Sequence, residues 1–314
     1  MRLYIVGQVV NLRPIGNRPV ATQAYFSTGC FFLGMRKFDS RKRSTSIAAN
    51  RSQIKDQPDR LVCSNGSERL AMTAAELYKA GKLTEAIQAV SAEIRDHPTD
   101  VRRRTFLFEL LCFAGDFGRA EKHLNVLAEG GPDAATGVLI YRAALHAEKM
   151  RTDLFTRKEY PVAADAPPVS GTWNGQAFES IEDADPRVGP RFEIYAAGQC
   201  MWLPLAHIAS LEMQPPKRVR DLLWIPTLVH TGDAFKGTEL GEVLAPALFP
   251  LSSRHADDAV KLGRLTVWAE EEGEPIPYGQ KTMLVDGEEM PILELRELVI
   301  TQPEAAPESH AAAE

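Results

Sequence analysis

Two segments of the sequence are related, Gly81-Lys-Leu-Thr-Glu-Ala86 and Gly115-Asp-Phe-Gly-Arg-Ala120, and they lie 34 residues apart. Pro98 and Pro132 recur at the same spacing. A period of this length with a glycine turn, an alanine and a closing proline is typical of tetratricopeptide-like (TPR-like) helical hairpins. Glycine suits the left-handed turn between paired helices, alanine lets the helices approach closely, and proline ends the second helix. The pattern therefore predicts TPR-like helical hairpins in the first half of the chain.

Apolar residues at helical spacing predict five helices in a domain over residues 72–158. The expected helices cover about 72–80, 84–96, 100–114, 117–128 and 134–150. Hairpins of this kind bury their apolar faces only by stacking. Because the repeat covers barely two and a half units, we expect the helices to lean on the domain that follows.

The first helix of each pair lines the concave face of such an array, and this face is suited to a partner's helix or peptide. The residues that the repeat register places there are Arg102, Thr105, Glu109, Phe113, Leu139, Ala143 and His146. Phe113 and Leu139 fit equally well as side chains that pack against the second domain, and both readings stay open.

Beyond a proline-containing linker over 159–172, the hydrophobic period changes from 3.6 to 2. The alternating segments that predict strands are 191–195, 200–203, 210–213, 223–229, 281–285 and 290–294. Short helical pieces are expected around 204–209, 217–223 and 257–262. Asp286-Gly287 favours a tight hairpin turn. We expect an α+β domain over 173–300 with a bent, barrel-like antiparallel sheet, followed by a disordered tail over 301–314.

Residues 1–71 differ from the rest of the chain in charge and pattern. They hold 12 Lys/Arg and 4 Asp/Glu, a net charge of +8, whereas residues 72–314 hold 24 and 38, a net charge of −14. The first segment lacks a sustained helical or strand period, and a periodic helix opens at Met72. We interpret 1–71 as a non-native or disordered extension and Met72 as the true start.

The composition also bears on the class of partner. An acidic body is a poor nucleic-acid binder, since neutralising phosphates requires clustered Lys and Arg. No stretch approaches the roughly 20 apolar residues of a membrane-spanning helix. The four cysteines form no CxxC pair and predict neither a zinc site nor another cofactor. We therefore expect no nucleic-acid, membrane or cofactor partner.

Candidate catalytic residues are scattered through the second domain rather than arranged in a motif. They are His207, His230, His255, Asp233, Asp257 and Asp258. The sequence contains no GxSxG, HExxH or GxxxxGK[ST] pattern. This favours a protein that is not an enzyme. The alternative is a small-molecule-binding or hydrolytic domain fused to a TPR-like interaction module, with a deep polar pocket near His230, Asp233 or His255.

A series of short motifs follows in a specific order along the second domain. They are Arg191-Phe-Glu-Ile-Tyr-Ala196, Trp202-Leu-Pro204, Pro215-Pro216, Arg220-Asp-Leu-Leu-Trp224, Leu248-Phe249-Pro250, Asp257-Asp258, Leu262-Gly263-Arg264 and Leu284-Val285-Asp286-Gly287. In this order they resemble the ImpE family, also called SciE-type virulence proteins or TagJ, accessory proteins of the bacterial type VI secretion system. The helical part, with Leu145-x-Ala147-Glu148-x-x-Arg151, resembles the same family. The similarity runs from about Met72 to Leu298.

The resemblance implies a cytoplasmic, non-enzymatic adaptor associated with the contractile sheath. It further implies that the N-terminal helix of the small sheath subunit is the partner, with an indirect link to sheath recycling by the AAA+ unfoldase. The family carries no catalytic residues to transfer. Arg218, Arg220 and Trp224 form a second candidate surface, and the alternative there is that Trp224 anchors the core while Arg220 pairs locally with Asp221.

Overall fold

The computed structural model describes residues 3–5, 8–10, 72–161, 168–232 and 240–301. The expectations for most of residues 1–71 and for the tail after 301 therefore lie outside the described residues, and both stay predictions.

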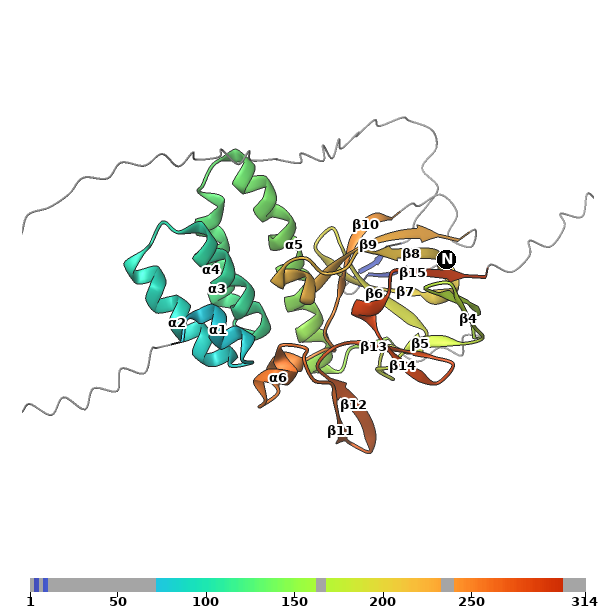
Figure 1. Cartoon of the computed structure of the whole chain (residues 1–314). Helices are drawn as coiled ribbons and strands as arrows, with labels where there is room; N and C mark the ends of the chain where they lie inside the picture. Colours follow the sequence, from blue (N-terminus) through green and yellow to red (C-terminus); the bar gives the residue numbers. More distant parts are fainter. Residues whose placement is uncertain (1–2, 6–7, 11–71, 162–167, 233–239, 302–314) are drawn as a thin grey trace, which may run out of the picture. The chain divides into compact units, whose positions relative to one another are not determined.

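Five α-helices open the main described part of the chain. They are α1 (Ala74–Lys79), α2 (Leu83–Asp96), α3 (Val101–Phe113), α4 (Phe117–Ala128) and α5 (Pro132–Arg157) (Figure 1). Thr73 starts α1 with a capping box, in which its hydroxyl accepts from the amide of Glu76 and the Glu76 carboxylate accepts from the Thr73 amide. Each helix packs against the next one along the chain. The predicted ranges match, except that α5 runs past 150 to Arg157.

The repeated residues occupy the positions that their chemistry suggested. Gly81 and Gly115 adopt positive φ angles of 81° and 71°, a conformation that glycine reaches without strain. Ala86 and Ala120 are fully buried, which fits a close approach of neighbouring helices. Classification of the helices as TPR-like hairpins remains a prediction.

Short antiparallel strands lie at the start of the described chain and after α5. Their bounds are β1 (Leu3–Ile5), β2 (Gln8–Val10), β3 (Gly171–Trp173), β4 (Gln176–Phe178), β5 (Ile181–Asp183), β6 (Arg191–Ala196), β7 (Gln199–Pro204), β8 (Ile208–Met213), β9 (Trp224–Thr231), β10 (Gly241–Pro246), β11 (Val267–Glu271), β12 (Glu274–Tyr278), β13 (Thr282–Val285), β14 (Glu288–Pro291) and β15 (Glu297–Ile300). Among the described residues the main sheet has the order β2-β1-β7-β6-β10-β9-β8-β15-β3-β4. A second sheet joins β11 to β12, and a third has the order β14-β13-β5.

The main sheet is open, which corrects the expected barrel-like closure. Its edges are β2 and β4, and within the described ranges no pairing joins them. Both edge strands are three residues long, and β5, the next strand after β4, pairs with β13 of another sheet. Barrel closure requires a continuous, staggered ladder around the circumference. Two three-residue edge strands cannot form such a ladder, since β5, which could have extended the sheet beyond β4, pairs with β13 instead.

The connections between strands agree with the predicted local signals. Asp286 and Gly287 take positive φ angles of 50° and 85° and turn β13 into β14. The 3₁₀ turns η1 (Leu205–His207) and η2 (Val219–Leu222) and the helix α6 (Asp258–Lys261) fall inside the expected helical pieces. The expected strand over 290–294 gives way after Pro291 to the 3₁₀ turn η5 (Ile292–Glu294).

The described residues form four apolar clusters, of which two are large and two are small. One large cluster lies within the sheet domain. The other belongs to the helices and also takes in Tyr195, Cys200, Leu223 and Trp224 from the sheet domain. The expectation that the helices lean on the second domain is therefore met by a shared core. In the part of the chain that the structure describes, no helix is long and apolar enough to cross a membrane.

Candidate functional site at the junction of helices and sheet

Arg151 of α5 enters the sheet domain and is fully buried there. Its Nε and Nη2 atoms donate to the two carboxylate oxygens of Glu193 on β6 at 3.0 and 2.6 Å. Nη2 also donates to the carbonyl oxygen of Leu248 at 3.1 Å. The fixed fork of a guanidinium matches a carboxylate in this two-bond arrangement. The pair therefore joins α5 to the middle of the main sheet.

Glu193 is the centre of a larger buried ion cluster. It accepts from Trp202 Nε1 at 3.0 Å and from Lys281 Nζ, and Lys281 Nζ also lies 2.5 Å from Asp183 Oδ2. Burial alone would raise the pKa of Glu193, but Arg151 and Lys281 outweigh it and hold this pKa well below its usual range. Burial raises the pKa of Asp183 to about 7, although Lys281 opposes the shift. Two cations and two carboxylates thus balance one another inside the protein.

Glu148, one turn before Arg151, ties a second pair of sheet residues to α5. Its Oε2 atom accepts from the Tyr195 hydroxyl at 2.6 Å and from Trp224 Nε1 at 3.0 Å. Trp224 itself is 2% exposed and packs near the ring of Phe108 on α3. The polar atoms of Tyr195 and Trp224 are therefore both satisfied by one helix carboxylate.

A third contact joins α3 to η2. Arg220 Nε lies 3.6 Å from Glu109 Oε1, and the Arg220 guanidinium stacks 4.4 Å from the ring centroid of Tyr141 on α5. Burial raises the pKa of Glu109 to about 7, partly opposed by Arg220. The two candidate surfaces of the sequence thus contact each other, because the Arg218–Trp224 segment covers part of the face predicted to be concave.

The predicted partner-binding residues divide into buried and exposed ones. Phe113 is 1% exposed and Glu109 and Trp224 are also buried, whereas Thr105 is half-buried with its hydroxyl donating to the Val101 carbonyl oxygen. The exposed ones are Arg102, Leu139, His146 and Arg218. The sequence had left two roles open for Phe113, a groove residue or a packing residue. In the structure Phe113 packs in the core that the helices share with the sheet domain.

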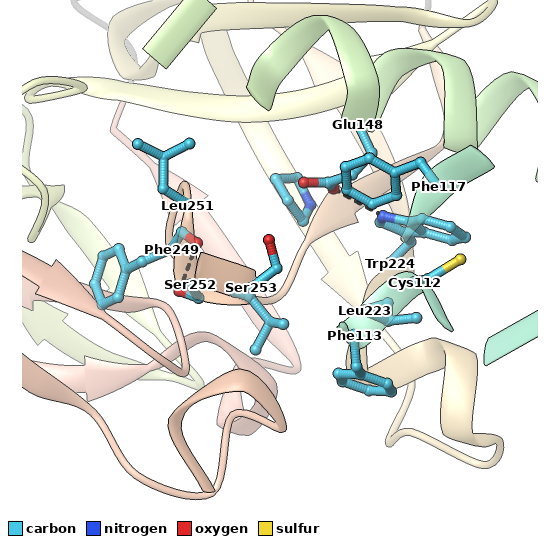
Figure 2. A pocket seen from close by; sticks show the side chains of 12 residues that line it. Cys112, Phe113, Phe117, Glu148, Leu223, Trp224, Phe249, Leu251, Ser252 and Ser253 are labelled. Carbon is cyan, nitrogen blue, oxygen red and sulfur yellow. Dashed lines mark hydrogen bonds between the residues drawn. The ribbon is translucent and has the colours of Figure 1, made fainter. Parts of the chain in front are cut away.

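A small hollow opens beside this junction, and Figure 2 shows its lining side chains. Phe113, Phe117 and Trp224 stand on one side and Leu251 and Ser253 on the other. Its volume is about 20 Å³, which holds one water molecule. A small-molecule substrate needs a pocket of roughly 300 Å³ or more, so the hollow is far too small for one.

Asp257 and His255, two of the residues considered for catalysis, serve local structure. Asp257 Oδ1 accepts from the Ala259 amide and caps α6, and His255 Nδ1 accepts from the Asp257 amide at 3.1 Å. Ser252 donates its hydroxyl to the Phe249 carbonyl oxygen. Asp233 lies outside the described residues. Within the described ranges, no group of three or more His, Cys, Asp or Glu side chains is placed to hold a metal ion.

The two described cysteines are not activated thiols. Cys112 and Cys200 are buried and unpaired, and burial raises the pKa of each thiol well above its usual value. A nucleophilic cysteine needs the opposite shift, since the thiolate is the reactive form. These thiols pack in the core shared by helices and sheet.

Comparison with known proteins identifies the family. A family model described as ImpE protein matches residues 175–299. The type VI secretion system accessory component TagJ of Pseudomonas aeruginosa is 31% identical over 266 residues, which cover 73% of this chain and 91% of that protein. The chain belongs to the ImpE family. The resemblance drawn from the motifs is thereby confirmed.

A solved structure supports the fold of this ImpE-family chain. The crystal structure of protein VPA1032 from Vibrio parahaemolyticus superimposes with a TM-score of 0.64 at 23% identity. The match covers 73% of this chain and 98% of that one. At this identity the likeness shows a shared fold.

The motifs that carried the resemblance meet at the junction. Glu148 and Arg151 come from the helical motif, and Glu193, Trp202 and Trp224 come from motifs of the second domain. Sequence reasoning missed the roles of Glu193 and Lys281. A charged residue between apolar neighbours in a predicted strand, as in Phe192-Glu193-Ile194, was the available signal for a buried ion pair.

Proposed function

We propose that this ImpE-family protein is a non-enzymatic adaptor of the bacterial type VI secretion system. It acts in the cytoplasm, binds a helix of the small contractile-sheath subunit, and is linked through the sheath to assembly or to recycling by the AAA+ unfoldase. The observation that carries the proposal is the 31% identity to a type VI accessory component over 91% of that protein's length.

The chemistry of the junction supports an adaptor over a catalyst. Glu193 and Asp183, two carboxylates with perturbed pKa values, are buried and pair with Arg151 and Lys281. Perturbed ionisable groups mark an active site when they line a cleft. Here they serve the contact between helices and sheet. The alternative of a hydrolytic or small-molecule domain lacks support from the hollow of about 20 Å³.

A binding titration tests the proposal. The purified full chain is titrated by isothermal titration calorimetry with the intact small sheath subunit and with a synthetic peptide of its N-terminal helix. We expect saturable binding to both, at similar affinity, and no binding to a peptide of the same composition in scrambled order. Absence of binding to the subunit and to the peptide would overturn the proposal.

A further inference from the structure

The β11–β12 hairpin has two outer edges that differ in chemistry. Among the described residues, its two strands pair with each other and with no further strand. Figure 1 shows the hairpin projecting from the rest of the sheet domain. Ile276 and Tyr278 of β12 hold its base in a small apolar cluster. A free strand edge presents a row of unpaired N–H and C=O groups with which another strand can pair.

The turn of the hairpin determines which backbone groups point to the outer edges. Glu271 pairs with Glu274, and the two residues between them, Glu272 and Gly273, have positive φ angles of 54° and 88°. Two central residues with positive φ make a type I′ turn, whose flanking residues form a hydrogen-bonded pair. Antiparallel pairs alternate between hydrogen-bonded and non-hydrogen-bonded ones. The pair next to the turn and every second pair beyond it therefore direct their backbone groups outward.

The two prolines of β12 occupy these outward positions. Pro275 pairs with Glu270, and Pro277 pairs with Trp268. Proline carries no amide hydrogen, so the outer edge of β12 lacks a donor at both positions. On β11, Trp268 and Glu270 direct N–H and C=O groups outward, and no proline, lysine or bulge interrupts this strand. The hairpin is therefore protected against a further strand on one edge and open to it on the other.

The side chains around the open edge of β11 indicate the charge of the strand that fits it. Four exposed carboxylates lie on β11, in the turn and at the start of β12: Glu270, Glu271, Glu272 and Glu274. Glu271 accepts from the Tyr278 hydroxyl and Glu272 pairs with Lys158, whereas Glu270 and Glu274 form no ion pair with another described residue. Like charges on neighbouring strands are destabilising, so a second copy of this hairpin fits the edge poorly and a basic strand fits it well.

We propose that the open edge of β11 binds an extended segment of a partner protein as an antiparallel third strand, with adjacent Lys or Arg residues followed by apolar ones. Trp268 and Glu270 exchange backbone hydrogen bonds with this segment. Its basic side chains lie beside Glu270 and Glu271, and an apolar side chain lies beside the ring of Trp268, which is 40% exposed. In this mode the main chain supplies affinity and the side chains supply specificity. The site is separate from the helix binding proposed above and does not depend on it.

NMR titration of the full chain with a cyclic β-hairpin peptide tests the site. One edge strand of the peptide carries the order Lys-Lys-Val-Val-Val, and cyclisation lowers the entropy cost of ordering it. We expect saturable binding in which the amide signals of Trp268 and Glu270 shift and exchange more slowly with solvent. Two control peptides, one with N-methylated amides on that edge and one with glutamate in place of lysine, should each bind about tenfold more weakly or less.

Variants of the full chain separate the backbone contribution from the side-chain contribution. Trp268→Pro removes an outward-facing amide, whereas Trp268→Val removes the ring and keeps the amide, so the proline variant should bind about tenfold more weakly than the valine variant. Glu270→Lys should weaken binding by a similar factor. Glu297→Lys is its matched control and should bind like the parent chain, since Glu297 is exposed on β15, which pairs with β8 and β3 on its two sides.

The outcomes decide whether a strand adds to β11. Circular dichroism verifies that each variant is folded, and the N-methylated peptide tests the backbone contacts without any change to the protein. Loss of affinity with Trp268→Pro and with Glu270→Lys, but not with Glu297→Lys, supports the site. Equal affinity of the N-methylated and parent peptides, or no binding of the parent peptide, overturns it. Sedimentation of the full chain as a dimer that Trp268→Pro dissociates would also overturn it, because the occupant would then be a second copy.

Discussion

Replacing Arg151 by methionine tests whether the buried ion cluster holds the helices to the sheet. The guanidinium makes three hydrogen bonds, at 3.0 and 2.6 Å to Glu193 and at 3.1 Å to Leu248. Removing one partner of a buried pair costs about 3–5 kcal/mol, because the remaining charge stays buried without its counterion. Lys281 remains beside Glu193, so we expect a loss near the lower end, about 3 kcal/mol.

Urea unfolding measures this loss. Circular dichroism follows the helices, and tryptophan fluorescence follows the sheet domain, which holds all four tryptophans of the chain. With a slope of about 2–3 kcal/mol per molar urea, the midpoint should fall by about 1 M or more. Arg157→Met is the matched control on the same helix, since Arg157 pairs with Glu159 at 3.3 Å and both side chains are more than half exposed. Exposed pairs contribute little, so its midpoint should not move. Equal midpoints for the two variants would refute the reasoning.

Three further predictions follow from the fold. Burial raises the pKa of Glu109 from 4.5 to about 7. The contribution of Glu109 to stability is therefore full below pH 4.5 and is lost as the pH rises to about 7. Glu109→Gln should flatten this part of the curve of stability against pH, and an unchanged curve would contradict the assignment. Ala120 is fully buried, so Ala120→Leu should lower the free energy of unfolding by about 1–3 kcal/mol through overpacking. No change in the urea midpoint would place residue 120 away from a close helix crossing. A chain that begins at Met72 loses only β1 and β2 of the described elements and should melt within a few degrees of the full chain in calorimetry; a clear fall would assign residues 1–71 a structural role.

The helices were predictable because their signal is local and repeated. The 34-residue spacing and the positive-φ glycines fix where α2 and α4 begin, and apolar spacing fixes their buried sides. Alternation likewise identified β6 to β9, and Asp286-Gly287 identified the β13–β14 hairpin.

Strands with weak local patterns escaped prediction. Residues Glu274–Tyr278 contain two prolines, which disfavour a central strand. They nevertheless form β12, because among the described residues this strand pairs with β11 alone and its other edge is open. β15 pairs with β8 and β3, which lie far away in sequence. Such pairing and the open edges of the main sheet depend on tertiary packing rather than on local pattern.

The candidate site was predicted only in part for the same reason. Register placed Glu109 and Phe113 on one face, but the segment that covers this face, Arg218–Trp224, comes about 100 residues later. The link from Lys281 to Asp183 spans a similar distance. Neither contact leaves a short-range signature in the sequence. Register named Leu139, which is exposed in the structure, and its role in partner binding stays a prediction.

Hydrogen–deuterium exchange of the full chain, with and without the sheath-subunit helix, tests the central claim most directly. We expect added sheath-subunit helix to slow exchange in at least one of the helices α1 to α5, while a peptide of the same composition in scrambled order leaves exchange unchanged. Exchange that stays the same in all five helices would contradict the proposed adaptor function.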